Sequence, residues 1–213
     1  MYNNIKRWTI IGGIFGLIGV LSALFSIFSP LPLKPTFIIG FLFGPFLAIG
    51  LMGLYFFISY HRESPSALIG VVFGIIACSI VNTMLVVQGA IKIIMYKKID
   101  QTVDIIAKDS LKQTLNGLHT IHLGMDVAWD IFIGLSLLFF GISTYRITGF
   151  KLRFTYLTII LGIAILVLNI WTFPIPPANA GLFDIGPIAA IYFIFLFIWL
   201  LTRSRHFEPN PTL

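Results

Sequence analysis

The stretch WTIIGGIFGLIGVLSALFSIF, Trp8–Phe28, decides the fold class of this chain. It carries no charged residue, and a helix that crosses the hydrocarbon of a membrane needs about 20 such residues at about 1.5 Å each. The whole chain has the same character, because 58% of its 213 residues are hydrophobic and only 10% are charged. Soluble domains carry about 25% charged residues. The composition therefore predicts an integral membrane protein.

Six apolar runs of this length occur along the chain, at about 8–28, 36–60, 66–91, 123–145, 154–173 and 185–201. Each is predicted to be a helix, because backbone that faces lipid must satisfy its own hydrogen bonds. Little sequence remains outside these runs. We therefore expect one all-α domain over residues 1–213, a polytopic bundle of six transmembrane helices.

The one long connection lies between the third and fourth runs. Its apolar residues keep a rough helical period at Ile99, Val103, Ile106, Leu111, Leu115 and Leu118. This pattern predicts an amphipathic helix on the outer membrane surface. A solvated loop is the alternative, because Asp100 and Asp104 interrupt the apolar face.

Small residues form a stripe along the first run, at Gly12, Gly16, Gly19, Ala23 and Ser26. Lipid gives helices no hydrophobic reason to associate, so such stripes serve close backbone approach. We expect close helix packing along this stripe, or the docking there of a second copy or of another membrane protein. Pro45 is expected to kink the second helix.

The net charge of +6 does not indicate a nucleic-acid partner, because the basic residues are scattered at helix ends. They are better explained as topology signals, since cytoplasmic loops carry an excess of Lys and Arg. With both termini in the cytoplasm, the larger share lies inside, at Lys6, Arg7, Arg62, Arg146, Lys151, Arg153, Arg203 and Arg205. We therefore expect cytoplasmic termini, with membrane lipid as the main partner.

The fourth run begins with a polar stretch, HTIHLGMDVAWD, His119–Asp130. At about 100° per residue, His119, His122, Asp126 and Asp130 fall on one face of a helix. A charged aspartate at the centre of a membrane helix costs about 2.5 to 3.5 kcal/mol to insert, so it should face the bundle interior. Asp130 is predicted to lie inside the membrane, with Asp126 and His122 leading outward.

Amides of neighbouring helices are expected at the level of Asp130. Counted from the inner helix ends, Asn82 in the third run and Asn169 in the fifth lie at that height. The sequence therefore predicts an outward-opening polar pocket formed by Asp130, Asp126, Asn82, Asn169, His122 and Asp184. The alternatives are amides that only join helices, a neutral Asp130 that donates to one of them, and an Asp184 that caps the last helix.

Three functional classes remain open. A binding, sensing or assembly protein comes first, and the handling of a proton, an ion or a small solute second, because the Asp126 and Asp130 carboxylates can share a proton. A metal-dependent hydrolase comes third. His119, His122 and Asp126 have a spacing that can hold one ion, but no other predicted transmembrane helix supplies a histidine. No cofactor and no catalytic residue are assigned.

Two blocks of the second half, DVAWDIFIGLSLLFFGIS (Asp126–Ser143) and LNIWTFPIPPANAGLFDIGP (Leu168–Pro187), carry a resemblance. They resemble segments of a broad group of uncharacterised bacterial six-helix membrane proteins. The resemblance implies the inner membrane of a bacterium as the location. It carries no activity over to this chain.

Overall fold

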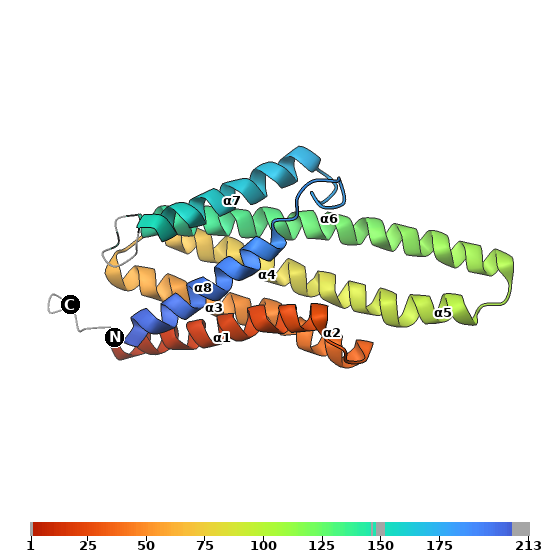
Figure 1. Cartoon of the computed structure of the whole chain (residues 1–213), viewed down its shortest axis with the longest axis horizontal. Coiled ribbons are helices and arrows are strands. Elements are labelled where there is room, and N and C mark those ends of the chain that lie inside the picture. Colours follow the sequence, from red (N-terminus) through yellow and green to blue (C-terminus); the bar gives the residue numbers. More distant parts are fainter. Residues whose placement is uncertain (1, 146, 148–151, 206–213) are drawn as a thin grey trace.

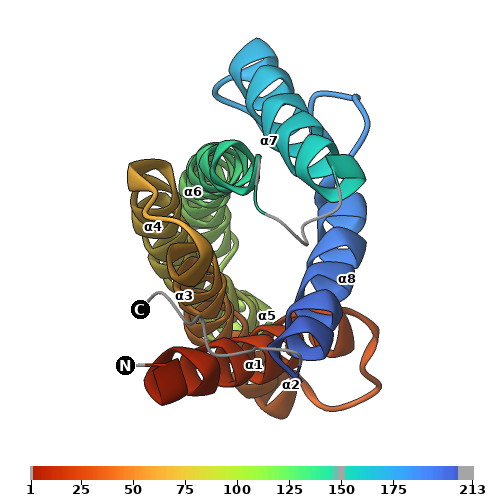
Figure 2. The ribbon, with the colours of Figure 1, turned by 90° about the vertical axis from the view of Figure 1, so that its left-hand side faces the viewer.

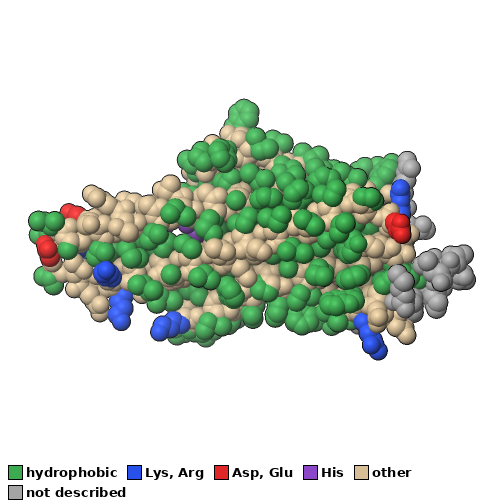
Figure 3. Space-filling model, turned by 180° about the vertical axis from the view of Figure 1, so that it is seen from behind, with side chains coloured by type: hydrophobic (Ala, Val, Ile, Leu, Met, Phe, Trp, Pro, Cys, Tyr) green, Lys and Arg blue, Asp and Glu red, His purple; other side chains and the backbone are tan. Residues whose placement is uncertain are grey.

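The computed structural model describes residues 2–145, 147 and 152–205 (Figure 1). Within these residues the chain is helical and no strand occurs. Six helical segments are long and apolar enough to cross a membrane. Hydrophobic side chains cover the middle of the surface, and charged side chains appear towards its two ends (Figure 3). The predicted all-α bundle of six transmembrane helices is therefore confirmed, and the chain is a multi-pass membrane protein.

The helices cover the six predicted runs. Their bounds are α1 (Tyr2–Phe28), α2 (Leu33–Phe41), α3 (Phe43–His61), α4 (Pro65–Ala90), the π-helical segment η1 (Ile91–Met95), α5 (Tyr96–Gln101), α6 (Ile105–Thr144), α7 (Leu152–Thr172) and α8 (Gly186–Arg205). Two basic residues used to predict the orientation, Arg146 and Lys151, lie outside the described residues. The side of the membrane on which the termini lie stays a prediction.

The second span is broken between α2 and α3, at Leu42. The backbone N–H of Leu42 donates to the carbonyl of Ile39 at 3.1 Å, which is a tighter turn than that of an α-helix. Pro45 follows the break, and its ring removes the N–H that would bond the carbonyl of Phe41. The regular helix is therefore interrupted three residues before Pro45, where the sequence predicted a kink.

The spans form a ring when the bundle is seen from the end at which α1 begins (Figure 2). Contacts join α1 to α3 and α8, α4 to α3 and α6, and α6 to α7. A hydrogen bond of 2.6 Å between the hydroxyls of Thr158 on α7 and Tyr192 on α8 closes the ring. We name its two halves by their place: the basal half holds the start of α1 and the end of α3, and the arm half holds the end of α1 and the start of α3.

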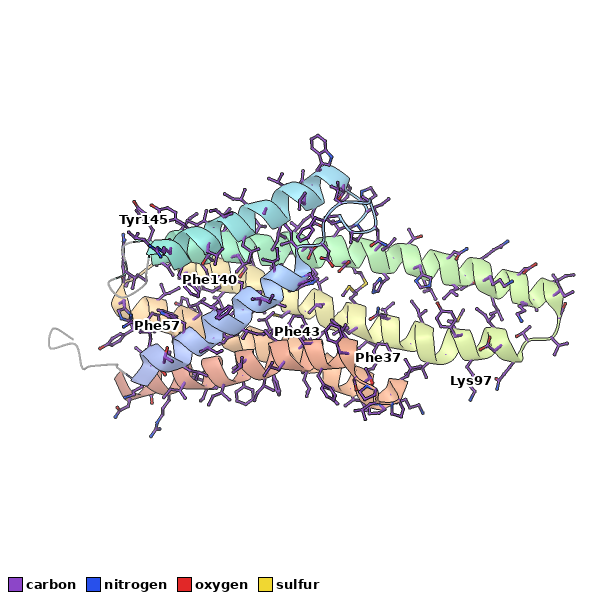
Figure 4. All side chains as sticks on the ribbon, viewed as in Figure 1. Phe37, Phe43, Phe57, Lys97, Phe140 and Tyr145 are labelled. Carbon is purple, nitrogen blue, oxygen red and sulfur yellow. The ribbon has the colours of Figure 1, made fainter. Side chains whose placement is uncertain are left out.

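Apolar side chains fill the basal half of the ring. Its largest buried side chains include Leu51, Phe57, Ile58, Phe140, Phe197 and Leu200. Phe57 and Phe140 lie towards the basal end, whereas Phe43 lies nearer the arm (Figure 4). The interior of this half is therefore a packed core, as expected for close-packed protein interiors.

The small-residue stripe of α1 is used inside the chain. Gly12 lies backbone to backbone against Gly53 of α3, with no room for an added Cβ. A Cβ on Gly16 would lie 2.5 Å from the ring of Phe197 on α8. Close approach of helices along small residues explains both contacts. The partner predicted for this stripe would have to displace α3 or α8.

Two helical columns extend beyond the rest of the bundle (Figure 1). One column is η1 with α5, and the other is the first part of α6; together we name them the arm, residues 91–121. Helix α6 has 40 residues and α7 has 21, which corresponds to lengths of about 60 Å and about 30 Å.

The prediction of an amphipathic helix on the membrane surface is wrong for this connection. Instead, the chain turns at residues 102–104 and returns as α6. Ile91, Ile99 and Leu115 are buried between the two columns of the arm. An apolar helical period fits a partner helix as well as a lipid surface. Here the partner helix covers Ile99 and Leu115, whereas Val103 and Ile106 near the turn are exposed.

Candidate functional site

A pocket of about 520 Å³ lies in the arm half of the ring. Its walls are the end of α1, the middle of α6, the end of α7 and the start of α8, and the loop between α7 and α8 adds part of the lining. This volume falls within the range of about 300 to 1,000 Å³ that is usual for ligand pockets. The pocket is therefore large enough for a small organic molecule.

Apolar and aromatic side chains make most of the pocket wall. They include Phe28 of α1, Trp129 of α6, Leu168 of α7 and Phe193 of α8. Trp129 meets Phe43 of α3 edge to face, with ring centroids 5.9 Å apart. Such a pair holds both rings in place, so the wall beside the acidic residues has a defined shape.

Three carboxylates line the same pocket: Asp126 and Asp130 on α6, and Asp184 in the loop before α8. Asp126 and Asp130 are one helical turn apart and therefore face the same side. Asp130 interacts electrostatically with both other acids, and Asp126 also interacts with His122. No lysine or arginine belongs to the described residues that line the pocket.

Asn169 joins α7 to the acidic side of the pocket. Its Nδ2 donates to Oδ2 of Asp130 at 3.0 Å and to the backbone oxygen of Ile165 at 3.0 Å. The carbonyl of Ile165 can only accept, so the NH₂ group is the half of the amide that faces it. Asn169 is only 2% exposed. Its Oδ1 is buried and accepts no hydrogen bond from the residues that the structure describes.

Asp184 has a second task beside lining the pocket. Its Oδ1 accepts a hydrogen bond of 2.8 Å from the backbone N–H of Gly186, the first residue of α8. This is the capping contact that the sequence suggested for Asp184, because the first amides of a helix have no partner within it. The cap fixes the position of the carboxylate over the pocket.

The pocket ends where the basal core begins. Phe193 lines the pocket and stacks on Phe197, with ring centroids 6.0 Å apart. Beside it, Tyr192 is 4% exposed and bonded to Thr158. Phe193 therefore belongs both to the pocket lining and to the packed core.

Two of the predicted site residues lie elsewhere. Asn82 on α4 lies against the backbone of Gly44 on α3, and it does not line the pocket. Its Oδ1 is buried and has no hydrogen-bond partner among the described residues. His122 is half-buried on α6 and does not line the pocket, but it interacts electrostatically with Asp126.

The metal interpretation has no structural support. His119 is exposed on the arm, whereas Asp126 lines the pocket. Among the residues placed by the structure, no three His, Cys, Asp or Glu side chains lie close enough together to hold one ion. Three protein ligands are the usual minimum for a catalytic zinc site. His119, His122 and Asp126 therefore do not form such a site.

The sequence did not single out the apolar residues that complete the pocket. Phe43 and Phe193 look like any other membrane-facing aromatic residue, and nothing in their spacing indicates a pocket. Ala23 had a signal, because it belongs to the small-residue stripe of α1, and a small side chain leaves space beside Asp130. The stripe therefore serves close packing at one end and the pocket at the other.

Comparison with family models, with curated proteins and with solved structures found no match to this chain. The six spans agree with the group of bacterial membrane proteins that two blocks of the sequence resemble. Membership of that group stays an expectation.

Proposed function

We propose that this membrane protein binds a small ligand in the pocket of the arm half, as a binding or sensing protein. The observation that carries the proposal is the contact between Asp130 and Asn169. A carboxylate within a membrane-spanning helix is costly and tends to mark a functional site. Here it is held by a buried amide, beside a pocket of about 520 Å³.

With both termini in the cytoplasm, the pocket belongs to the outer leaflet of a bacterial inner membrane, and the arm extends outside the cell. A ligand would reach Asp130 past Asp126 and the loop before α8. This direction is supported by the packed core of the basal half, because Phe193 of the pocket wall packs there against Phe197.

Labelling of an introduced cysteine tests whether the pocket is open to a ligand. The only natural cysteine, Cys78, is buried, so Cys78→Ser gives a background without thiols. In that background, Ala190→Cys places a thiol on the pocket wall. Ala77→Cys is the matched control, because Ala77 is 0% exposed in the apolar core.

We expect a water-soluble maleimide to label Ala190→Cys and to leave Ala77→Cys unlabelled in the folded protein. Equal lack of reaction at both positions would overturn the proposal, because the pocket would then be closed. Adding the reagent to right-side-out or to inside-out vesicles tests the orientation in the same assay. Labelling of Ala190→Cys only in right-side-out vesicles is the result expected for cytoplasmic termini.

The handling of a proton, an ion or a small solute is the second candidate. The observation in its favour is the pair of Asp126 and Asp130 on one face of α6. Transport also requires a path through the basal half, where Phe197 and Leu200 are both 0% exposed. A flux across proteoliposomes that disappears with Asp130→Asn would favour this candidate over simple binding.

A further inference from the structure

We infer that the ligand of the pocket is an organic cation, a protonated amine attached to an apolar body. This inference rests on the proposed function, since it names the chemistry of the ligand that the pocket would bind. It is carried by the charges and hydrogen-bonding groups of the pocket wall, by one buried acceptor, and by the aromatic surface beside them.

The charges of the pocket wall have one sign. Asp126, Asp130 and Asp184 all line it, and none of its described residues is a lysine or an arginine. Burying carboxylates away from water is unfavourable unless a positive charge or hydrogen-bond donors compensate for it. Among the described residues, Nδ2 of Asn169 donates to Asp130 and the N–H of Gly186 donates to Asp184, while His122 interacts electrostatically with Asp126. A carboxylate has about four acceptor positions, so most of them are left for a ligand.

A buried amide oxygen indicates what kind of cation would fit. Oδ1 of Asn169 is buried and accepts no hydrogen bond from the described part of the chain, in a residue that is 2% exposed and lines the pocket. Together with the carboxylates it makes a wall of acceptors. An ammonium group has hydrogen-bond donors and no acceptor, so it complements this wall in charge and in hydrogen bonding.

A metal ion is the other kind of cation to consider. No three His, Cys, Asp or Glu side chains among the described residues lie close enough together to hold one. A protonated amine can instead bind one or two acidic groups while its carbon skeleton fills the rest of the space. Trp129 and Phe193 provide faces for that skeleton, and aromatic faces also attract cations.

Three small molecules of similar shape test the inference on the full chain in nanodiscs of uncharged phosphatidylcholine. They are 2-phenylethylamine, 2-phenylethanol and 3-phenylpropanoate, which are positive, neutral and negative at pH 7. The readout is the rate at which the maleimide labels Ala190→Cys in the Cys78→Ser background. We expect the amine to slow labelling at a concentration about tenfold lower than the alcohol, and the carboxylate to be weakest.

Two substitutions assign the effect to the acidic groups. Asp126→Asn and Asp130→Asn keep the shape of the side chain and remove its charge, and each should weaken protection by the amine about tenfold. Asp109→Asn is the control, because Asp109 lies on the arm with its side chain 62% exposed. If Asp130→Asn does not fold, the inference is still tested by Asp126→Asn. It is also tested by comparing the three small molecules on the protein that keeps all its aspartates.

The outcomes separate the two proposals. If Ala190→Cys is labelled and the amine gives no protection, or if the amine and the alcohol protect equally, the inference of a cationic ligand is overturned. The proposal that the pocket binds a ligand would then still stand. Lack of labelling at Ala190→Cys would overturn the proposed function, and the inference with it. Protection by the amine that both pocket substitutions weaken, and that Asp109→Asn does not, would support it.

Discussion

The two halves of the ring treat their polar side chains differently. In the basal half, buried hydroxyls are satisfied within the protein: Thr144 bonds Thr155 at 3.2 Å, and Thr158 bonds Tyr192 at 2.6 Å. In the arm half, the carboxylate of Asp130 has a single amide donor, and the oxygen of Asn169 has no partner among the described residues. A polar group that the protein itself satisfies joins helices. A polar group left with free acceptors, beside a pocket, is better explained by a ligand.

The largest effect on the free energy of unfolding is expected in the basal half, at a position that has no room for a larger side chain. Gly12→Ala should lower the free energy of unfolding by about 3 kcal/mol, because its Cβ would overlap the backbone of Gly53. Gly117→Ala on α6 is the control, since no atom lies within 4 Å of the added Cβ, and it should be neutral or slightly stabilising. Unfolding in a series of detergent mixtures measures both. Equal stability of the two variants would contradict the close contact of α1 with α3.

Asp130→Asn, in the arm half, should stabilise the protein, whereas Gly12→Ala should destabilise it. The substitution removes a charge that lies beside Asp126 and Asp184, and an asparagine oxygen can still accept from Asn169. We expect the free energy of unfolding to rise by about 1 kcal/mol at pH 7 while the protection by the amine weakens about tenfold. A fall of more than about 1 kcal/mol would mean that Asp130 is a structural group, like the hydroxyls of the basal half.

Ser136→Ala should produce a smaller loss. Its hydroxyl donates to the backbone oxygen of Gly70 at 2.7 Å and joins α6 to α4 in the core. Hydrogen bonds between membrane helices contribute about 0.6 kcal/mol on average, and we expect a loss of that order in unfolding free energy. The control is Ser79→Ala, because the exposed hydroxyl of Ser79 bonds the backbone oxygen of Ile75 within its own helix, at 2.9 Å. A larger loss at Ser79 than at Ser136 would contradict this interpretation.

The smallest effect is expected on the arm. Lys112 and Asp109 form an exposed ion pair of 3.4 Å, one turn apart on α6. Exposed pairs contribute little, so Lys112→Ala should change the free energy of unfolding by less than about 0.5 kcal/mol. Addition of salt should remove even that difference. A larger change would mean that the arm is held by charge as well as by its apolar contacts.

The sequence predicted the level of the site along the bundle axis, but it did not predict towards which neighbouring helix each side chain points. Counting residues placed Asp130 and Asn169 at one level because an α-helix rises by a constant amount per residue, and the two side chains are hydrogen-bonded. The same count placed Asn82 at that level, but α4 turns it towards Gly44 of α3. The rotation of a helix about its axis depends on contacts such as that between Gly12 and Gly53, which a single sequence does not reveal.

The arm shows a second limit of the sequence. The apolar residues from Ile99 to Leu118 repeat with the period of a helix, and this period is the same whether lipid or another helix covers them. The turn at residues 102–104 decides between these alternatives, because the chain reverses direction there and α6 packs against α5. Asp104 accepts from the backbone N–H of Ile106 at 3.1 Å and starts α6 there. That cap was present in the sequence as an acidic residue before an apolar pair, and we interpreted it as an interruption of the apolar face.

Helix α6 is continuous from Ile105 at the tip of the arm, past the pocket, to Thr144 in the basal half. A rod of this kind acts as a lever. From Asp130 to Ile105 it measures about 37 Å at about 1.5 Å per residue, so a tilt of about 5° at the pocket displaces the tip by about 3 Å. A change in the packing beside Asp130 is therefore mechanically connected to the tip of the arm through a single stretch of backbone.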